Sequence, residues 1–153
     1  MVKAVLTPGQ KAQLQALNSK HAQADVDTII STIQQYVDEN SYRMNRGEIN
    51  VLPIQAAPNK KNKTLELTLL FVNLSQETIY QLRGDFEASL VEEKMTLETT
   101  DFVYDHDFLG NWENGQAILV TESLAYQGRP SKRVYQDKDI ALQLGAFKMV
   151  TDA

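Results

Sequence analysis

The sequence contains no cysteine, which excludes disulfides, cysteine nucleophiles and cysteine-ligated zinc or iron–sulfur centres together. It has only two histidines, His21 and His106. The seven glycines are scattered along the chain, so no glycine-rich loop is available for a phosphate or a dinucleotide. Serine-nucleophile elbows and zinc-protease motifs are absent as well. From these absences we predict that the protein is not an enzyme and holds no cofactor.

Long hydrophobic runs are also lacking. No stretch approaches the ~20 apolar residues of a membrane-spanning helix. The opening MVKAVLTPGQ has one lysine and a short apolar run, which is not the pattern of a secretory signal. We therefore expect no membrane insertion and a cytoplasmic location.

Basic residues are outnumbered by acidic ones, with 15 lysines and arginines against 20 aspartates and glutamates and a net charge of -5. The basic clusters, at residues 59–63 and 129–133, fall in stretches with the composition of turns, where charge runs usually face solvent. Because nucleic-acid binding requires clustered lysine and arginine, we predict no nucleic-acid partner.

Apart from these absences, the amino-acid composition is that of a globular protein. A chain of 153 residues with 42% hydrophobic content can bury one core. Its character changes near Gly47: earlier residues are rich in Gln, Ala, Asn and Ser at helical spacing, and later ones alternate apolar with polar side chains. We predict a helical extension at residues 1–46 and a β-sandwich domain at residues 47–153.

Two helices are expected in the N-terminal part. The first begins with Thr7 as its N-cap and Pro8 at the first helical position, where a missing N–H costs nothing. The second has Asp25 as its N-cap and carries one strongly apolar face. This face would pack on the sheet of its own chain or on a second copy in a homodimer. It is our candidate protein interface, formed by Val26, Ile29, Ile30, Ile33 and Val37.

The second part of the chain is predicted to be β-structure. Residues 64–73 alternate apolar and polar side chains with the period of a half-buried strand. Several such segments with short turns between them favour a fold of class α+β, in which the helical segment precedes an antiparallel immunoglobulin-like β-sandwich. The residues expected in its core are Leu65, Leu67, Leu69, Phe71, Leu82, Phe86, Leu90, Ile118, Val120, Ile140, Leu142 and Leu144.

Three positions predict irregularities in these strands. Pro53 cannot donate to a ladder, so its strand is expected to run along an edge. The parity of the apolar residues shifts within residues 95–104 and again at Gly145. Each shift predicts a bulge or a bend.

The tripeptide Arg83-Gly84-Asp85 matches the motif that adhesion receptors recognise on protruding loops. In residues 80–90, however, the even positions are apolar apart from the glycine and the odd positions are polar. This pattern places both charged side chains on the solvent side of an extended strand. We therefore do not interpret the tripeptide as an adhesion site.

One dense polar group is a candidate cation site. Asp101, Asp105, Asp107 and Glu113 offer oxygen ligands of the kind that calcium prefers, with His106 among them. The spacing is not that of an EF-hand loop. The alternative interpretation is a polar strand end that leads into a turn, and Trp112 in that turn is expected to cover the end of the core.

The segment from Gly47 onward opens with GEINVLPI at residues 47–54 and leads into a strand that ends in Phe71, one residue and Asn73. In these features, and over residues 47–150, the chain resembles the SLAP domain of Gram-positive bacteria, which takes its name from an S-layer assembly protein of the accessory Sec pathway. It implies a non-catalytic β-module without a cofactor that assists the export of surface proteins. It implies no catalytic residues.

These observations together predict a non-enzymatic protein-interaction module that assists the secretion or assembly of bacterial surface proteins, with a protein partner and a possible homodimer. The alternative is a small-ligand or calcium-binding β-sandwich that uses the acidic cluster from Asp101 to Glu113.

Overall fold

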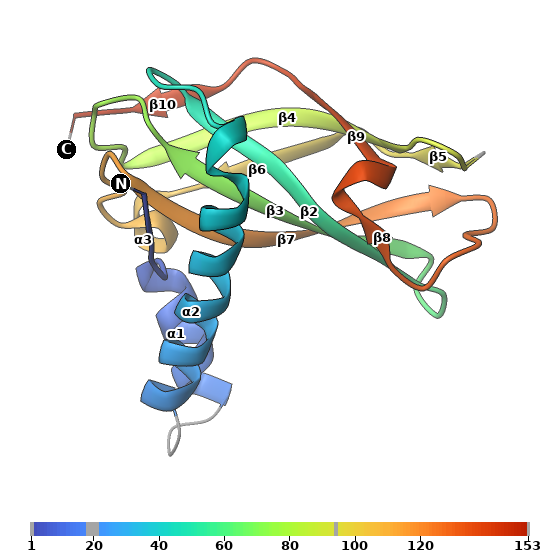
Figure 1. Ribbon diagram of the computed structural model, residues 1–153, viewed down its shortest axis with the longest axis horizontal. Helices are drawn as coiled ribbons and strands as arrows, with labels where there is room; N and C mark the ends of the chain where they lie inside the picture. Colours follow the sequence, from blue (N-terminus) through green and yellow to red (C-terminus); the bar gives the residue numbers. More distant parts are fainter. Residues whose placement is uncertain (1, 18–21, 94, 153) are drawn as a thin grey trace.

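In the computed structural model the chain is a mixed α+β structure in which an N-terminal helical segment precedes two predominantly antiparallel sheets (Figure 1). The structure describes residues 2–17, 22–93 and 95–152. The fold class expected from the sequence is confirmed at this level.

The larger sheet contains six of the described strands, in the order β1-β7-β3-β2-β8, with β5 on the same edge of β7 as β1. All its pairings are antiparallel except that of β1 with β7, which is parallel. Its strands are β1 (Lys3–Ala4), β2 (Ile49–Asn59), β3 (Thr64–Asn73), β5 (Thr96–Leu97), β7 (Gln116–Gln127) and β8 (Tyr135–Gln136).

The smaller sheet is centred on β4 (Gln81–Leu90). One edge of β4 pairs with β6 (Thr100–Tyr104), and the other pairs with β9 (Ile140–Leu144) and then with β10 (Lys148–Val150). The register of β10 differs by one residue from that of β9, so the bulge predicted at Gly145 is confirmed.

The main core fills the space between the facing sides of the two sheets. Phe71 of β3 makes edge-to-face contacts with two rings of β6, Phe102 at 5.5 Å and Tyr104 at 5.7 Å between ring centroids. Ten of the twelve core residues predicted from the sequence are buried: Leu65, Leu67, Leu69, Phe71, Leu82, Phe86, Leu90, Ile118, Val120 and Ile140.

The prediction was wrong for Leu144, which is 41% exposed, and Leu142 is only half-buried. Ile140 at the start of β9 is buried, so exposure rises along this edge strand as it runs from the core toward the rim. The space above Gly84 is taken instead by Phe147, whose Cδ1 would lie 2.4 Å from a Cβ at that glycine. Because Gly84 has no side chain, Phe147, in the link between β9 and β10, packs against the core there.

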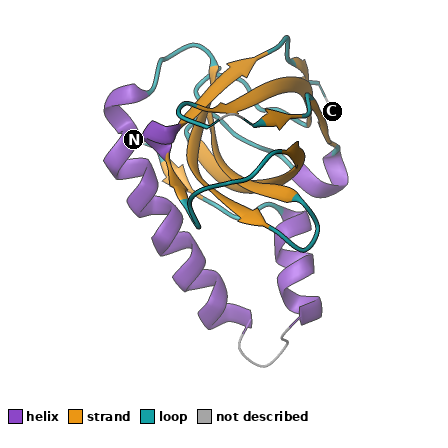
Figure 2. Cartoon of the chain, turned by 90° about the vertical axis from the view of Figure 1, so that its right-hand side faces the viewer, coloured by secondary structure: helices purple, strands orange, loops and turns teal. Residues whose placement is uncertain are grey.

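Two helices of the N-terminal segment extend from the outer side of the larger sheet (Figure 1). They are α1 (Pro8–Leu17) and α2 (Ala22–Asn40), and they lie farther apart beside the sheet than at their opposite ends (Figure 2). Ile33 and Val37 of α2 are 1% and 2% exposed and lie in one apolar cluster with Leu70 and Val72 of β3. None of the helices in the described part of the chain is long and apolar enough to cross a membrane.

The start of α1 confirms the predicted cap. The Thr7 hydroxyl accepts a hydrogen bond from the Gln10 N–H at 3.1 Å, and the Gln10 side-chain oxygen accepts one from the Thr7 N–H at 3.0 Å. This is a reciprocal capping box. The start of α2 was predicted wrongly, since the helix begins at Ala22 and Asp25 lies inside it. The small and polar residues Ala22, Gln23 and Ala24 show no apolar period, so this first turn could not be predicted.

The N-terminal segment also contributes to the sheet, which the sequence did not predict. Strand β1 is held to β7 by hydrogen bonds from Lys3 N to Gly115 O and from Val5 N to Ala117 O. On its other side, Gln34 of α2 accepts from the Ala4 N–H at 2.8 Å and donates to the Val2 carbonyl at 3.1 Å. The helical segment is therefore joined to the sheet by backbone pairing and not only by apolar packing.

The parity shift in residues 95–104 marks a change of sheet. Strand β5 pairs with β7 in the larger sheet, and β6 pairs with β4 in the smaller one. Pro53 lies at a register shift in β2, on a stretch that pairs with β3, while β8 reaches only Gln55 and Ala56. The change of sheet agrees with the predicted bend. The edge was predicted only in part, because β2 lies between β3 and β8, and its second side pairs with β8 at Gln55 and Ala56 but with no described strand at Pro53.

Thr100, the first residue of β6, gives a prediction about stability. Its hydroxyl oxygen is buried without a hydrogen-bond partner among the described residues. Thr100→Val keeps the shape and removes the unsatisfied group, so we expect a gain of about 1 kcal/mol in the free energy of unfolding. Urea denaturation measures it, with Thr121→Val at an exposed position of β7 as the control. A loss of stability at Thr100 would contradict the assignment of a buried, unpaired hydroxyl.

Candidate functional site

The structure does not bring the predicted acidic cluster together as a metal site. Among the described residues no three His, Asp or Glu side chains are placed to hold a metal ion. Asp105 is used locally, because its Oδ1 accepts the Phe108 N–H at 2.9 Å and caps the short helix α3 (His106–Leu109). Asp101, Asp107 and Glu113 are exposed. The arrangement is that of a polar strand end entering a turn.

Two other residues singled out in the sequence have structural roles. Trp112 is 1% exposed, and its indole N–H donates to the Gln116 carbonyl at 3.1 Å, so it covers the end of the core as predicted. His106 Nε2 lies 3.0 Å from the Asn111 side-chain oxygen, and its ring contacts Tyr80 at 5.7 Å between centroids. His21 lies outside the described residues.

The candidate interface on α2 is partly used within the chain. Ile33 and Val37 are buried against the sheet, whereas Val26, Ile29 and Ile30 are half-buried beside the same cluster. The first of the two packings considered, on the sheet of the same chain, is therefore present. Self-association through the half-buried part of this face stays a prediction.

The Arg-Gly-Asp tripeptide lies in the middle of β4, as expected. Arg83 is paired with Val103 on one side and Lys148 on the other, and Asp85 is paired with Asp101. The backbone is therefore held in the sheet and does not form a protruding loop.

The outer side of the smaller sheet carries a grooved surface, which we call the β4 face. Two adjoining grooves, of about 390 and 290 Å³, share Arg83, Val103 and Lys148 in their walls. Val103 and Val150 are 71% and 43% exposed there. The face is formed by the outward residues of β4, β6 and β10: Gln81, Arg83, Asp85, Glu87, Asp101, Val103, Lys148 and Val150.

The charges of the β4 face are arranged in like-signed pairs. Arg83 lies directly opposite Lys148, and Asp85 lies directly opposite Asp101. Like charges in these positions destabilise a sheet. None of the four is in an ion pair within the described part of the chain, where the salt bridges are Arg43–Asp137 and Lys132–Asp139. The face therefore presents one positive and one negative row side by side, both available to a partner.

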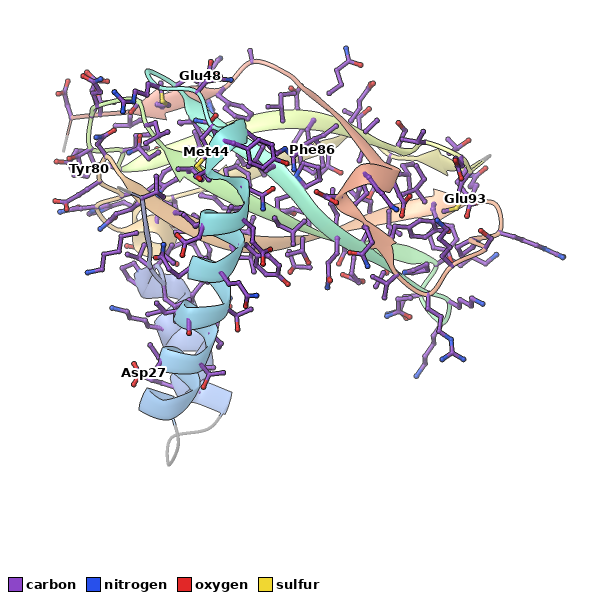
Figure 3. The ribbon with its side chains drawn as sticks, in the orientation of Figure 1. Asp27, Met44, Glu48, Tyr80, Phe86 and Glu93 are labelled. Carbon is purple, nitrogen blue, oxygen red and sulfur yellow. The ribbon has the colours of Figure 1, made fainter. Side chains whose placement is uncertain are left out.

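A second polar group lies at the far end of the molecule, where Glu93 is opposite to Tyr80 along the long axis (Figure 3). Glu93 accepts hydrogen bonds from the Tyr135 hydroxyl at 2.6 Å, the Ser131 N–H at 3.1 Å and the Ser131 hydroxyl. The Tyr135 hydroxyl in turn accepts from the N–H groups of Ser131 and Lys132. The network joins the turn after β4 to the segment before β8, so its role is to fix two loops.

These hydrogen bonds, first that from the Ser131 hydroxyl and then that from Tyr135, lower the pKa of the Glu93 carboxyl below its ordinary value. Burial and the contact with Glu93 raise the pKa of the Tyr135 hydroxyl. At neutral pH the pair is therefore a carboxylate that accepts from a neutral phenol.

The lowered pKa gives a prediction about pH. The stabilisation by Glu93 is fully present above the pKa of its unfolded state and is lost as the pH falls through the lower pKa of the folded state. Glu93→Gln should therefore have a lower Tm than the wild type at pH 7, and the difference should close below about pH 4.5. Thermal unfolding across this range measures it, with Glu92→Gln as the neighbouring control. A difference that is constant with pH would contradict the role of the carboxylate.

The β4 face was not identified from the sequence. The polar odd positions of β4 correctly indicated a solvent-facing side, but the opposed charges come from strands distant along the chain. No family model, curated protein or solved structure matches this chain, and so its resemblance to SLAP domains stays a prediction.

Proposed function

We propose that the protein is a non-enzymatic protein-binding module and that the β4 face is its binding surface. The observation that carries the proposal is the contrast between the outer sides of the two sheets. Part of the larger sheet is covered by α2, whereas the β4 face is grooved, exposes Val103 and Val150, and holds two like-charged pairs outside ion pairs. Exposed apolar side chains within a charged surface are typical of protein–protein contacts.

The class of partner follows from the resemblance of residues 47–150 to SLAP domains. We propose that the partner is a secreted or surface-layer protein and that the module assists its export or assembly. We also propose that the two facing sheets form an immunoglobulin-like sandwich, since their strands are mostly antiparallel and share one core. The parallel strand β1 is an addition to that pattern.

A photo-crosslinking amino acid tests the surface directly. Placed at Val103, it should yield a discrete adduct with a partner protein in the cells that produce the chain. The same amino acid at Lys60, an exposed turn residue away from the β4 face, is the matched control. Adducts of equal yield from both positions, or none from Val103, would contradict the proposal.

A further inference from the structure

We propose that a second copy of this chain binds beside the β4 face, at the open edge of β6, through antiparallel pairing of two β6 strands around a two-fold axis at Phe102. The inference deepens the proposed function and rests on its choice of the β4 face as the binding surface. The pairing would join the two smaller sheets into one continuous sheet across the dimer.

The first support is the unpaired edge of β6. Among the described strands β6 pairs with β4 alone, and its outward residues Asp101 and Val103 are exposed. The strand Thr100–Tyr104 contains neither lysine nor proline, the residues that commonly protect an edge. An edge of this kind can pair with another strand.

The second support is the direction of the backbone groups. The Asp85 carbonyl accepts from the Gly145 N–H at 2.9 Å, so Asp85 directs its backbone away from β6. Directions alternate along an antiparallel strand, so the neighbouring Gly84 directs its groups toward Phe102, its partner in β6. Asp101 and Val103 must then direct their N–H and C=O groups to the open edge.

A two-fold axis at Phe102 places Asp101 of one copy opposite Val103 of the other. Both residues have edge-directed backbone groups, so each such pair can form two hydrogen bonds. An axis halfway between two residues would pair an edge-directed residue with an inward-directed one. Such pairs form no backbone hydrogen bonds. The directions of the backbone groups therefore require the two-fold axis to pass through a residue and not between two residues.

The charges select among the remaining registers. An axis at Asp101 would oppose two copies of that carboxylate, and an axis at Val103 would oppose Asp101 with Asp105. The axis at Phe102 avoids both. It continues the row Lys148–Arg83–Val103 of one copy into Asp101–Asp85 of the other. Two positive and two negative residues then lie in one row, separated by a valine.

The spacing suits this contact. Strands in a sheet are about 4.8 Å apart, so Arg83 of one copy and Asp101 of the other are separated by about 9.6 Å between backbones. An arginine side chain extends far enough over Val103 to reach an aspartate at this distance. The pairing would cover the exposed Val103 and give each like-charged pair an opposite partner across the axis.

The test is sedimentation velocity from about 10 µM to about 1 mM, because an interface this small is expected to be weak. The wild type should form dimers whose dissociation constant rises more than about 10-fold when salt is raised to about 1 M, where the screening length is about 3 Å. A wild type that is monomeric throughout the range at low salt overturns the proposal.

Charge reversal tests the register. One variant, Arg83→Glu with Lys148→Glu, makes these four paired residues all negative, and another, Asp85→Lys with Asp101→Lys, makes them all positive. Each alone should lose self-association by more than about 10-fold, and an equimolar mixture should recover it as a heterodimer. If the folded variants fail to associate in the mixture, or each still forms homodimers, the register is wrong.

A backbone variant tests the edge without altering charge. Val103→Pro removes an N–H that points to the open edge, so it costs no internal ladder hydrogen bond and should abolish the dimer while the fold is retained. Val103→Thr keeps the N–H and should associate like the wild type. Dimers of Val103→Pro as strong as those of the wild type would exclude β6 pairing.

The proposed self-pairing and the proposed function can be disproved independently of each other. A monomeric wild type that still gives a photo-crosslinked adduct with a different protein from Val103 would end the self-pairing and leave the proposed function. If Val103 crosslinks only to a second copy of the chain, and the wild type forms reversible dimers, the self-pairing is supported. The proposal of a different partner protein is then contradicted.

Discussion

Asn73→Leu is expected to lower the free energy of unfolding by about 3–4 kcal/mol, although the two side chains have similar size. Asn73 is fully buried at the end of β3. Its amide donates to the carbonyls of Glu77 at 2.9 Å and Trp112 at 3.0 Å, and its oxygen accepts from the N–H and the hydroxyl of Ser75. Leucine would remove all four of these hydrogen bonds, and the Trp112 carbonyl would keep only the one it accepts from the Ile79 N–H.

The effect should be large because Asn73 joins two segments that are distant along the chain. Trp112 pairs with Ile79 through two backbone hydrogen bonds, of 2.8 and 3.0 Å, so the amide fixes both sides of this bridge to β3. A buried polar side chain with every group satisfied specifies one arrangement of the surrounding loops. We therefore expect the Trp112 turn to lose protection together with the loop at Glu77.

Urea denaturation with hydrogen exchange measures both consequences. Asn62→Leu, in an exposed turn between β2 and β3, is the matched control and should change stability by less than about 0.5 kcal/mol. Equal effects of the two substitutions would show that the hydrogen bonds of Asn73 contribute little.

Ile33→Asp is expected to cost about 3–5 kcal/mol, because it places an unpaired charge where α2 meets the larger sheet. Ile33 is 1% exposed and belongs to the apolar cluster with Leu70 and Val72. No compensating cation from the described residues is paired there. The helix should separate from the sheet, and the chain should unfold at lower urea concentration.

The same variant bears on the interface predicted from the sequence. Circular dichroism and light scattering on Ile33→Asp would show a destabilised chain if the residue is required by its own sheet. Ser31→Asp, on the exposed side of the same helix, is the control and should leave stability nearly unchanged. A fully stable monomer of Ile33→Asp, obtained from a dimeric wild type, would instead support an interface between copies through α2.

The sequence predicted the strands whose alternation is strong and missed those that depend on distant partners. Strand β3 was recognised over its full length, but it was taken to be half-buried. Leu70 and Val72 point to the outer side and are also buried, because α2 lies over them. The continuous apolar run from Leu69 to Val72 is typical of a strand covered on both faces and contained this information.

Other features could not be predicted from a single amino-acid sequence. Strands β1 and β8 have two residues each, too few to show a period. The opposed charges of the β4 face depend on the register between β4 and strands that come later in the chain. Phe147 enters the core only because Gly84 leaves space for it, which is a property of packing and not of pattern.

The parallel pairing of β1 with β7 has a consequence for the order of folding. Lys3 and Ala4 pair with Gln116 and Ala117, so during synthesis they must wait for a strand made about 110 residues later. The surface beneath α2 includes Ala4 and Ala117, and it is incomplete until both are in place. Contacts between such distant residues form slowly, because the intervening chain must be closed into a loop first. The N-terminal helix α2 is therefore synthesised early and docks late, with its apolar face open to chaperones during that interval.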